Sequence, residues 1–122
     1  MNRFYSPPPE SELSESRVRN LVKTEFVDAC SGFLDRLACA HVFDVERYDA
    51  MKLWLELLKR CYVLADDEIP QYTFRHLPTI FQVLEQEATY SSDQKVECRN
   101  ALFELREIMR NLGMENEGGR PS

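Results

Sequence analysis

The sequence has few glycines, and their positions exclude the common phosphate-binding motifs. Of the four glycines in 122 residues, Gly32 stands alone and the others lie at or after Gly113. A phosphate-binding loop needs several glycines clustered before a helix, and a nucleophile elbow needs two around one serine. Neither pattern occurs, so the sequence predicts no nucleotide-binding loop and no serine-hydrolase site.

Histidines and paired cysteines are also scarce, which argues against a metal centre. Neither His41 nor His76 follows a glutamate at the Glu-x-x-His spacing of di-iron bundles, and no CxxC motif occurs. Cys39 and His41 would supply only two zinc ligands from one turn. The acidic run Asp66-Asp67-Glu68 reads as a solvated turn rather than an acid-base pair. We therefore expect no metal, no cofactor and no enzymatic activity.

The chain lacks a charged-then-apolar leader and any run of about 18 apolar residues. Cys30, Cys61 and Cys98 fall on predicted apolar faces, which is typical of buried, reduced thiols in a cytoplasmic protein. Basic residues number 15 against 21 acidic ones, a formal charge of −6 that disfavours bulk attraction to nucleic acid or anionic membranes. We expect a cytoplasmic protein with no membrane partner.

The richest apolar pattern is Val45–Leu64, which contains the only tryptophan, Trp54. Its apolar residues cover an arc about twice as wide as that of an ordinary surface helix, so neighbours should contact it on two or three sides. We predict the central helix of a bundle, with Asp44 as its N-cap. The core should centre on Trp54 and Leu58, packed by six further residues, namely Phe26, Phe33, Phe81, Leu84, Leu105 and Ile108.

Three other segments have helical periodicity. The first runs from a cap at Ser11 or Ser14 to about Ala40. Within it Gly32 either simply destabilises the helix or allows another helix to approach closely. The third region divides at Pro78 into a short helical turn over 71–76 and a helix over 78–88. The last helix follows a capping box at Ser91 and Gln94 and spans about 92–112.

Short connections between these helices favour antiparallel neighbours. We predict an all-α fold, an antiparallel four-helix bundle in up-down-up-down order, with a short extra helical turn before Pro78 and flexible termini. The expected organisation is an extended Pro-rich arm over 1–10, a single helical-bundle domain over 11–113 and a flexible tail over 114–122. The arm, MNRFYSPPPE, is either a disordered leader or a docking segment anchored by Phe4 and Tyr5 on the domain or on a partner.

Charge is sorted on the last helix, where four cations share about 60° of the helical wheel beside Phe103. Such a basic edge either binds an anionic surface or pairs with acids of neighbouring helices. If Arg99, Arg106 and Arg110 all form ion pairs within the fold, the basic edge gives no reason to expect a partner there. The candidate partner-binding residues are Phe4, Tyr5, Asp66, Asp67, Glu68, Lys95, Arg99, Phe103, Arg106 and Arg110.

These features predict a small acidic, non-catalytic protein-binding module: an adaptor, a chaperone or an inhibitor of another macromolecule's surface, with bacterial or phage machinery as one class of target. The alternative is nucleic-acid or nucleoprotein binding through the basic edge of the last helix. A further ridge of Tyr72, Val83 and Tyr90, together with Leu21, is a candidate homodimer face.

Overall fold

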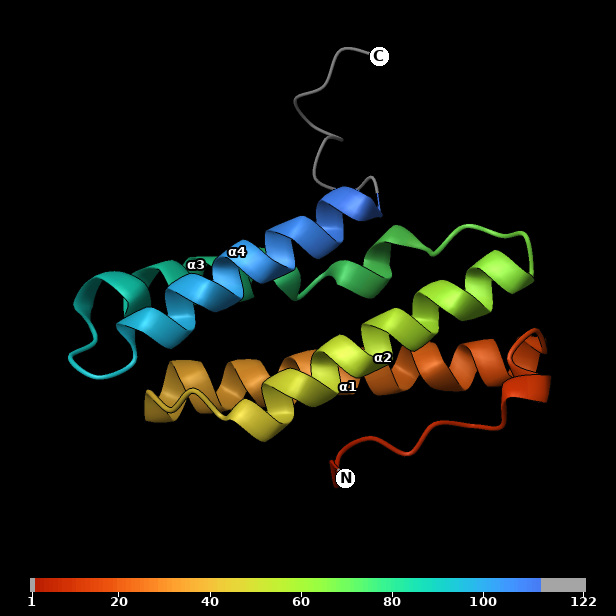
Figure 1. Cartoon of the computed structure of the whole chain (residues 1–122), viewed down its shortest axis with the longest axis horizontal. Coiled ribbons are helices and arrows are strands. Elements are labelled where there is room, and N and C mark those ends of the chain that lie inside the picture. The colour runs from red at the N-terminus through yellow and green to blue at the C-terminus, as the bar shows by residue number, and fades with distance from the viewer. Residues whose placement is uncertain (1, 113–122) are drawn as a thin grey trace, which may run out of the picture. The chain divides into compact units, whose positions relative to one another are not determined.

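The computed structural model describes residues 2–112, and all regular secondary structure in that range is helical (Figure 1). Helix α1 runs antiparallel to α2, and α3 runs antiparallel to α4, so the predicted all-α fold of four main helices is confirmed. The extra helical turn before Pro78 is also confirmed. The elements are η1 (Glu10–Glu12), α1 (Ser16–Ala40), α2 (Val45–Leu64), η2 (Gln71–Phe74), α3 (Leu77–Tyr90) and α4 (Lys95–Asn111), where η denotes a 3₁₀ turn.

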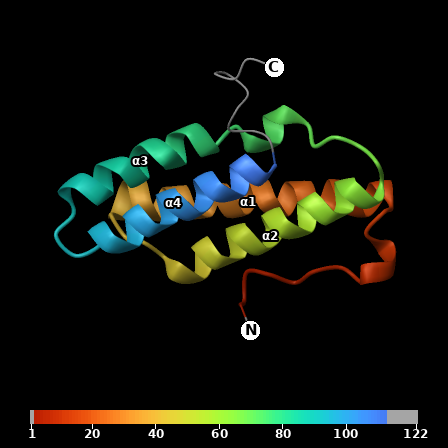
Figure 2. The ribbon, with the colours of Figure 1, turned by 45° about the horizontal axis from the view of Figure 1, so that its top comes forward.

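The described residues form two compact units, 2–80 and 81–112, and the division falls inside α3. In the first unit α1 and α2 lie side by side in opposite directions (Figures 1 and 2). In the second unit the rest of α3 turns through residues 91–94 into the antiparallel α4 (Figure 2). No helix within 2–112 is both long and apolar enough to cross a membrane.

Both ends of α2 lie where the sequence predicted them, and the capping bonds give the reason. At its start the Asp44 carboxylate accepts a hydrogen bond from the Arg47 amide at 3.1 Å. At its end Asp66 adopts a left-handed φ of 54°, and its amide donates to the Val63 carbonyl at 3.1 Å. The Asp67 amide donates to the Tyr62 carbonyl at 3.0 Å, which completes a Schellman motif without glycine.

The other two predicted caps were misplaced. α1 begins at Ser16 after Glu15, and neither Ser11 nor Ser14 caps it, because residues 10–12 close as a 3₁₀ turn that buries Leu13 ahead of the helix. Ser91 does accept a hydrogen bond from the Gln94 amide at 3.1 Å. That bond stabilises the turn over 91–94 instead of the first helical turn, so α4 begins at Lys95 rather than near 92.

The predicted core is largely confirmed. Trp54 and Leu58 are 3% and 0% exposed. The prediction that Phe81 and Ile108 are buried was wrong. Both keep part of their surface exposed, because each lies at the edge of its helix's apolar arc rather than at its centre. The remaining predicted core residues are buried, namely Phe26, Phe33, Leu84 and Leu105.

The structure also resolves the question of Gly32. A Cβ atom built at this position would lie 2.8 Å from Nη1 of Arg47, so the glycine leaves room for a side chain from α2 against α1. The cysteines match expectation: Cys39 is exposed, while the other three are buried and all four are free. Burial raises the pKa of Cys30 to about 12 and that of Cys98 to about 11.

Candidate functional site

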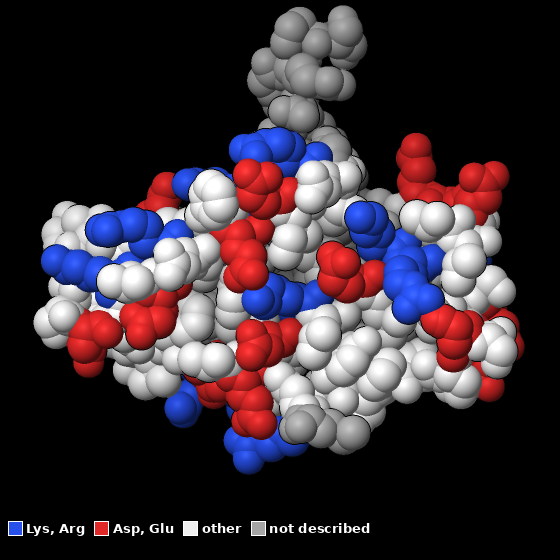
Figure 3. Space-filling model, in the orientation of Figure 1, with Lys and Arg blue, Asp and Glu red and all other residues white. Residues whose placement is uncertain are grey.

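Helix α4 is sorted into a buried face and a charged outer face. Its buried residues recur at spacings of three and four, which places them on one side of the helix. The flank next to this buried side carries the four cations of the predicted basic edge. Basic side chains gather over α4 beside acidic ones in the space-filling view (Figure 3). The buried residues are Cys98, Ala101, Leu102, Leu105 and Met109.

Two of the four cations are engaged within their own unit. Arg106 Nη2 lies 2.8 Å from Oε2 of Glu85 on α3, and its guanidinium carbon lies 5.8 Å from the centre of the Phe81 ring. Arg110 Nη1 lies 2.8 Å from Oε2 of Glu107, three residues earlier on α4. Arg106 thus links α4 to α3, and Arg110 pairs within the last turns of α4. Both side chains are already engaged and are poorly placed to serve as free contacts for a partner.

Lys95 and Arg99 differ from them. Within residues 2–112 the structure gives neither side chain an ion pair, and both side chains are exposed. Among the described residues Arg99 is therefore not paired as Arg106 and Arg110 are. Internal ion pairing does not account for the whole basic edge, and partner binding there stays a hypothesis. Two adjacent turns of α4 present positive charge to solvent.

Beside these two cations lie the large exposed apolar side chains of α4. Phe103 is 69% exposed and Val96 is 64% exposed. Val96 was missed in the sequence, although its position seven residues before Phe103 puts both on one stripe of the helix. We call Lys95, Val96, Arg99 and Phe103 the α4 face. An exposed aromatic ring and an exposed valine flanked by two cations can bury apolar area while attracting an acidic surface.

The acidic turn over Asp66, Asp67 and Glu68 is used mainly within the chain. The Glu68 amide donates to Asp67 Oδ1 at 2.8 Å, and Arg19 Nη1 of α1 donates to Asp67 Oδ2 at 3.0 Å. These two hydrogen bonds, the backbone one first, hold the pKa of Asp67 below its usual range. Asp66 supplies the left-handed residue of the helix end, and Glu68 is exposed.

The N-terminal arm packs on α2 of its own chain. The Trp54 indole donates from Nε1 to the Phe4 carbonyl at 3.0 Å, and the Tyr5 ring meets the indole edge-on with centroids 4.9 Å apart. Asn2 Nδ2 donates to the Glu46 carbonyl at 2.7 Å. Of the two interpretations of the arm, the structure favours docking, and the anchor of Phe4 and Tyr5 is the domain itself.

Charged contacts extend the docking to both ends of the arm. Arg3 pairs with Glu46 at 3.2 Å, and Arg60 pairs with Glu10. The guanidinium groups of Arg3 and Arg47 lie 4.9 and 4.5 Å from the centre of the Phe4 ring. Partial burial raises the pKa of Tyr5, while the Arg60 charge acts in the opposite direction. Phe4 and Tyr5 are therefore occupied in the free chain.

The predicted site residues thus divide between the units, with the arm and acidic turn in 2–80 and the basic edge in 81–112. Among the described residues no three His, Cys, Asp or Glu side chains are grouped as a metal site would require. The predicted tail over 114–122 lies outside the described residues. No protein-family model matches the sequence, and neither a curated protein nor a solved structure is significantly similar to it.

Proposed function

We propose that this chain is a non-catalytic protein-binding module and that it binds an acidic surface of another protein through the α4 face. The observation that carries the proposal is the combination of Phe103, 69% exposed, with Lys95 and Arg99, which lack an ion pair among residues 2–112. Aromatic residues and arginines are enriched among the few interface residues that contribute most of the binding free energy.

The division between fastened and free cations supports this assignment. Arg106 and Arg110 form ion pairs with Glu85 and Glu107, so a partner that bound them would first have to break an existing ion pair. Binding to Lys95 and Arg99 would break no ion pair among residues 2–112. The expected contact is therefore centred on the N-terminal half of α4, between Lys95 and Phe103.

The test is affinity purification from the native cell with four forms of the full chain. The wild type should retain a stoichiometric partner, whereas Phe103→Ala and Arg99→Glu should each weaken binding by about tenfold or more. The matched control is Tyr90→Ala, because Tyr90 is 83% exposed in the same unit but belongs to α3. Equal retention by all four proteins, wild type included, would remove the α4 face from the proposal.

Nucleic-acid binding is the second candidate, because exposed cations beside an aromatic ring also suit a phosphate backbone and a stacked base. With two of the four cations in ion pairs, the dependence of log K on log salt should have a slope no steeper than about −2. A gel shift at low salt with single- and double-stranded probes tests it. Absence of any shifted band eliminates this candidate and leaves the protein partner.

A further inference from the structure

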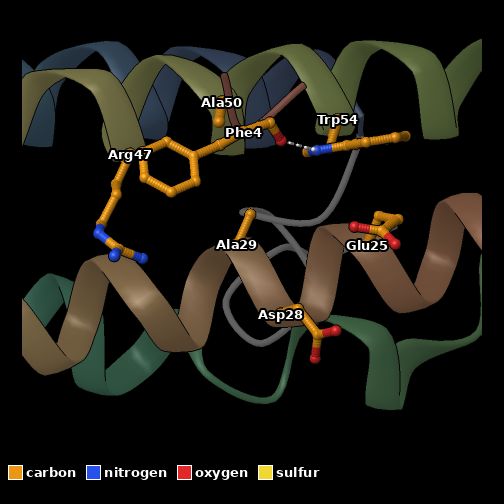
Figure 4. A pocket seen from close by; sticks show the side chains of 7 residues that line it. All are labelled: Phe4, Glu25, Asp28, Ala29, Arg47, Ala50 and Trp54. Atoms are coloured by element: carbon orange, nitrogen blue, oxygen red, sulfur yellow. Dashed lines mark hydrogen bonds between the residues drawn. The ribbon is translucent and has the colours of Figure 1, made fainter. Parts of the chain in front are cut away.

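A cavity of about 190 Å³ opens between α1 and α2, beneath the docked arm (Figure 4). It is smaller than the 300 Å³ or more typical of pockets that hold drug-sized ligands. Its walls come from three segments, which are the arm through Phe4, α1 through Glu25, Asp28 and Ala29, and α2 through Ala50 and Trp54. A cavity of this size suits one side chain or a small alkyl compound.

The positive charge in this cavity is already compensated. Arg47, the remaining wall residue, has its Nε 3.3 Å from Asp44 Oδ2 and its guanidinium carbon 4.5 Å from the centre of the Phe4 ring. It also lies against Gly32, about two helical turns along α1 from Glu25. In Figure 4 Arg47 and Glu25 stand at opposite ends of the cavity, so the Arg47 charge is held away from the end beneath Trp54.

The negative charge is not compensated. Glu25 and Asp28 lie three residues apart on α1, and both border the cavity. Among residues 2–112 neither carboxylate has a hydrogen bond or an ion pair. Glu25 stands opposite an apolar wall formed by Ala50 and the buried Trp54, whereas the exposed Asp28 carboxylate points away from α2 and lies at the rim of the cavity (Figure 4). The Glu25 end of the cavity therefore combines one uncompensated carboxylate with apolar surface.

We propose that this cavity binds an organic cation, an ammonium or guanidinium head on a short alkyl chain. The head would pair with Glu25, with the Asp28 carboxylate adding negative charge at the rim, and the alkyl chain would lie along Ala29, Ala50 and the edge of Trp54. The same chemistry is present in a lysine or arginine side chain of another protein and in a free alkylamine. A simple anion is disfavoured by the two carboxylates, and a divalent metal would find too few oxygen ligands.

Phe4 makes the cavity depend on the arm. Its ring forms part of the wall, and its carbonyl accepts the hydrogen bond from Trp54. A bound cation should therefore stabilise the docked arm, and removal of residues 1–9 should weaken cation binding. This inference does not rest on the α4 face, since every residue of the cavity belongs to the unit 2–80.

The indole N–H of Trp54, the only tryptophan, gives a single reporter for the experiment. Titration of the full chain with n-butylguanidinium and n-butylammonium should shift its NMR signal saturably, while n-butanol and butyrate at equal ionic strength should not. A capped Gly-Gly-Lys-Gly-Gly peptide forms the second arm. Saturation by the peptide alone assigns the site to a protein side chain, and saturation by the free amines alone assigns it to a small ligand.

Variants make the test specific. Glu25→Gln combined with Asp28→Asn should weaken binding about fivefold or more, whereas Asp35→Asn, an exposed carboxylate of α1 outside the cavity, should leave it unchanged. Circular dichroism checks that each variant keeps its helical content, and calorimetry measures binding independently of the indole. The proposal is overturned by equal responses to butanol or butyrate, by no saturable binding in either arm, or by unchanged affinity of the folded double variant.

Discussion

Tyr5 and Phe103 are aromatic residues on two segments that looked alike as binding surfaces in the sequence, yet their surroundings differ. Tyr5 packs edge-on against Trp54, in an arm held by hydrogen bonds to α2. Phe103 is 69% exposed on a helix whose apolar contacts lie on its other face. An aromatic residue in an extended, proline-rich segment can fold back onto its own domain, whereas one on the outer face of a helix cannot turn inward.

The comparison makes a general point about charge as well. The charges of the arm are matched by opposite charges of the same unit: Arg3 pairs with Glu46, and Glu10 pairs with Arg60 of α2. Among residues 2–112, the α4 cations that have an ion pair are the two arginines of its C-terminal half, Arg106 and Arg110. Compensation within the chain therefore separates residues that serve the fold from residues available to a partner.

The largest expected change in stability comes from truncating Trp54, the residue on which the arm packs. Trp54→Ala should lower the free energy of unfolding by about 3 to 5 kcal/mol, because it removes a buried indole and leaves a cavity. Urea denaturation followed by circular dichroism measures it. Trp54→Phe is the graded control, since it keeps much of the ring but loses the hydrogen bond to Phe4. An unchanged midpoint for the alanine variant would contradict the central role of α2.

Removal of the arm comes next. Deletion of residues 1–9 should cost about 2 kcal/mol, the sum of an aromatic pair and a hydrogen bond. It should also shift the Trp54 emission to longer wavelength as water reaches the indole. Ser6→Ala, an exposed arm residue, is the matched control. If the deletion behaves like the control in both measurements, the arm does not dock on Trp54 in solution.

A smaller, pH-dependent effect is expected at the acidic turn. The folded-state pKa of Asp67 is depressed, so its stabilising contribution is present above the ordinary value of 3.8 and is lost as pH falls through the lower folded value. Asp67→Asn should therefore lower the melting temperature slightly at pH 7 and make no difference well below pH 3.8. Asp66→Asn is a useful control, because asparagine also accepts the left-handed backbone. Equal differences at both pH values would show that the ionised carboxylate of Asp67 is not the cause.

The smallest stability effect should occur where the binding effect is largest. Phe103→Ala should change the free energy of unfolding by no more than about 0.5 kcal/mol, since the ring is mostly exposed. Measured beside Trp54→Ala in the same urea titration, it separates the two aromatic environments directly. A loss of 2 kcal/mol or more on the scale of core truncations would mean that the ring is buried in solution, and the α4 face would lose its centre.

The sequence by itself determined the helical fold, because apolar periodicity, Pro78 and the Asp44 cap act locally. The extent of α2 followed from these signals alone. It also singled out the basic edge of α4, since residues on one face of a helix are fixed by spacing. The starts of α1 and α4 could not be placed, because in each case the chain just before the helix folds into a turn of its own.

Only the tertiary structure decided which candidate residues are already engaged. Whether Phe4 and Tyr5 pack on Trp54, whether Gly32 admits Arg47, and whether Arg106 finds Glu85 depends on contacts between segments distant in the sequence. The same is true of the cavity that Glu25, Asp28 and Phe4 share. Periodicity fixes the face of a helix on which a side chain lies, but its partners are set by packing, and packing depends on the whole chain.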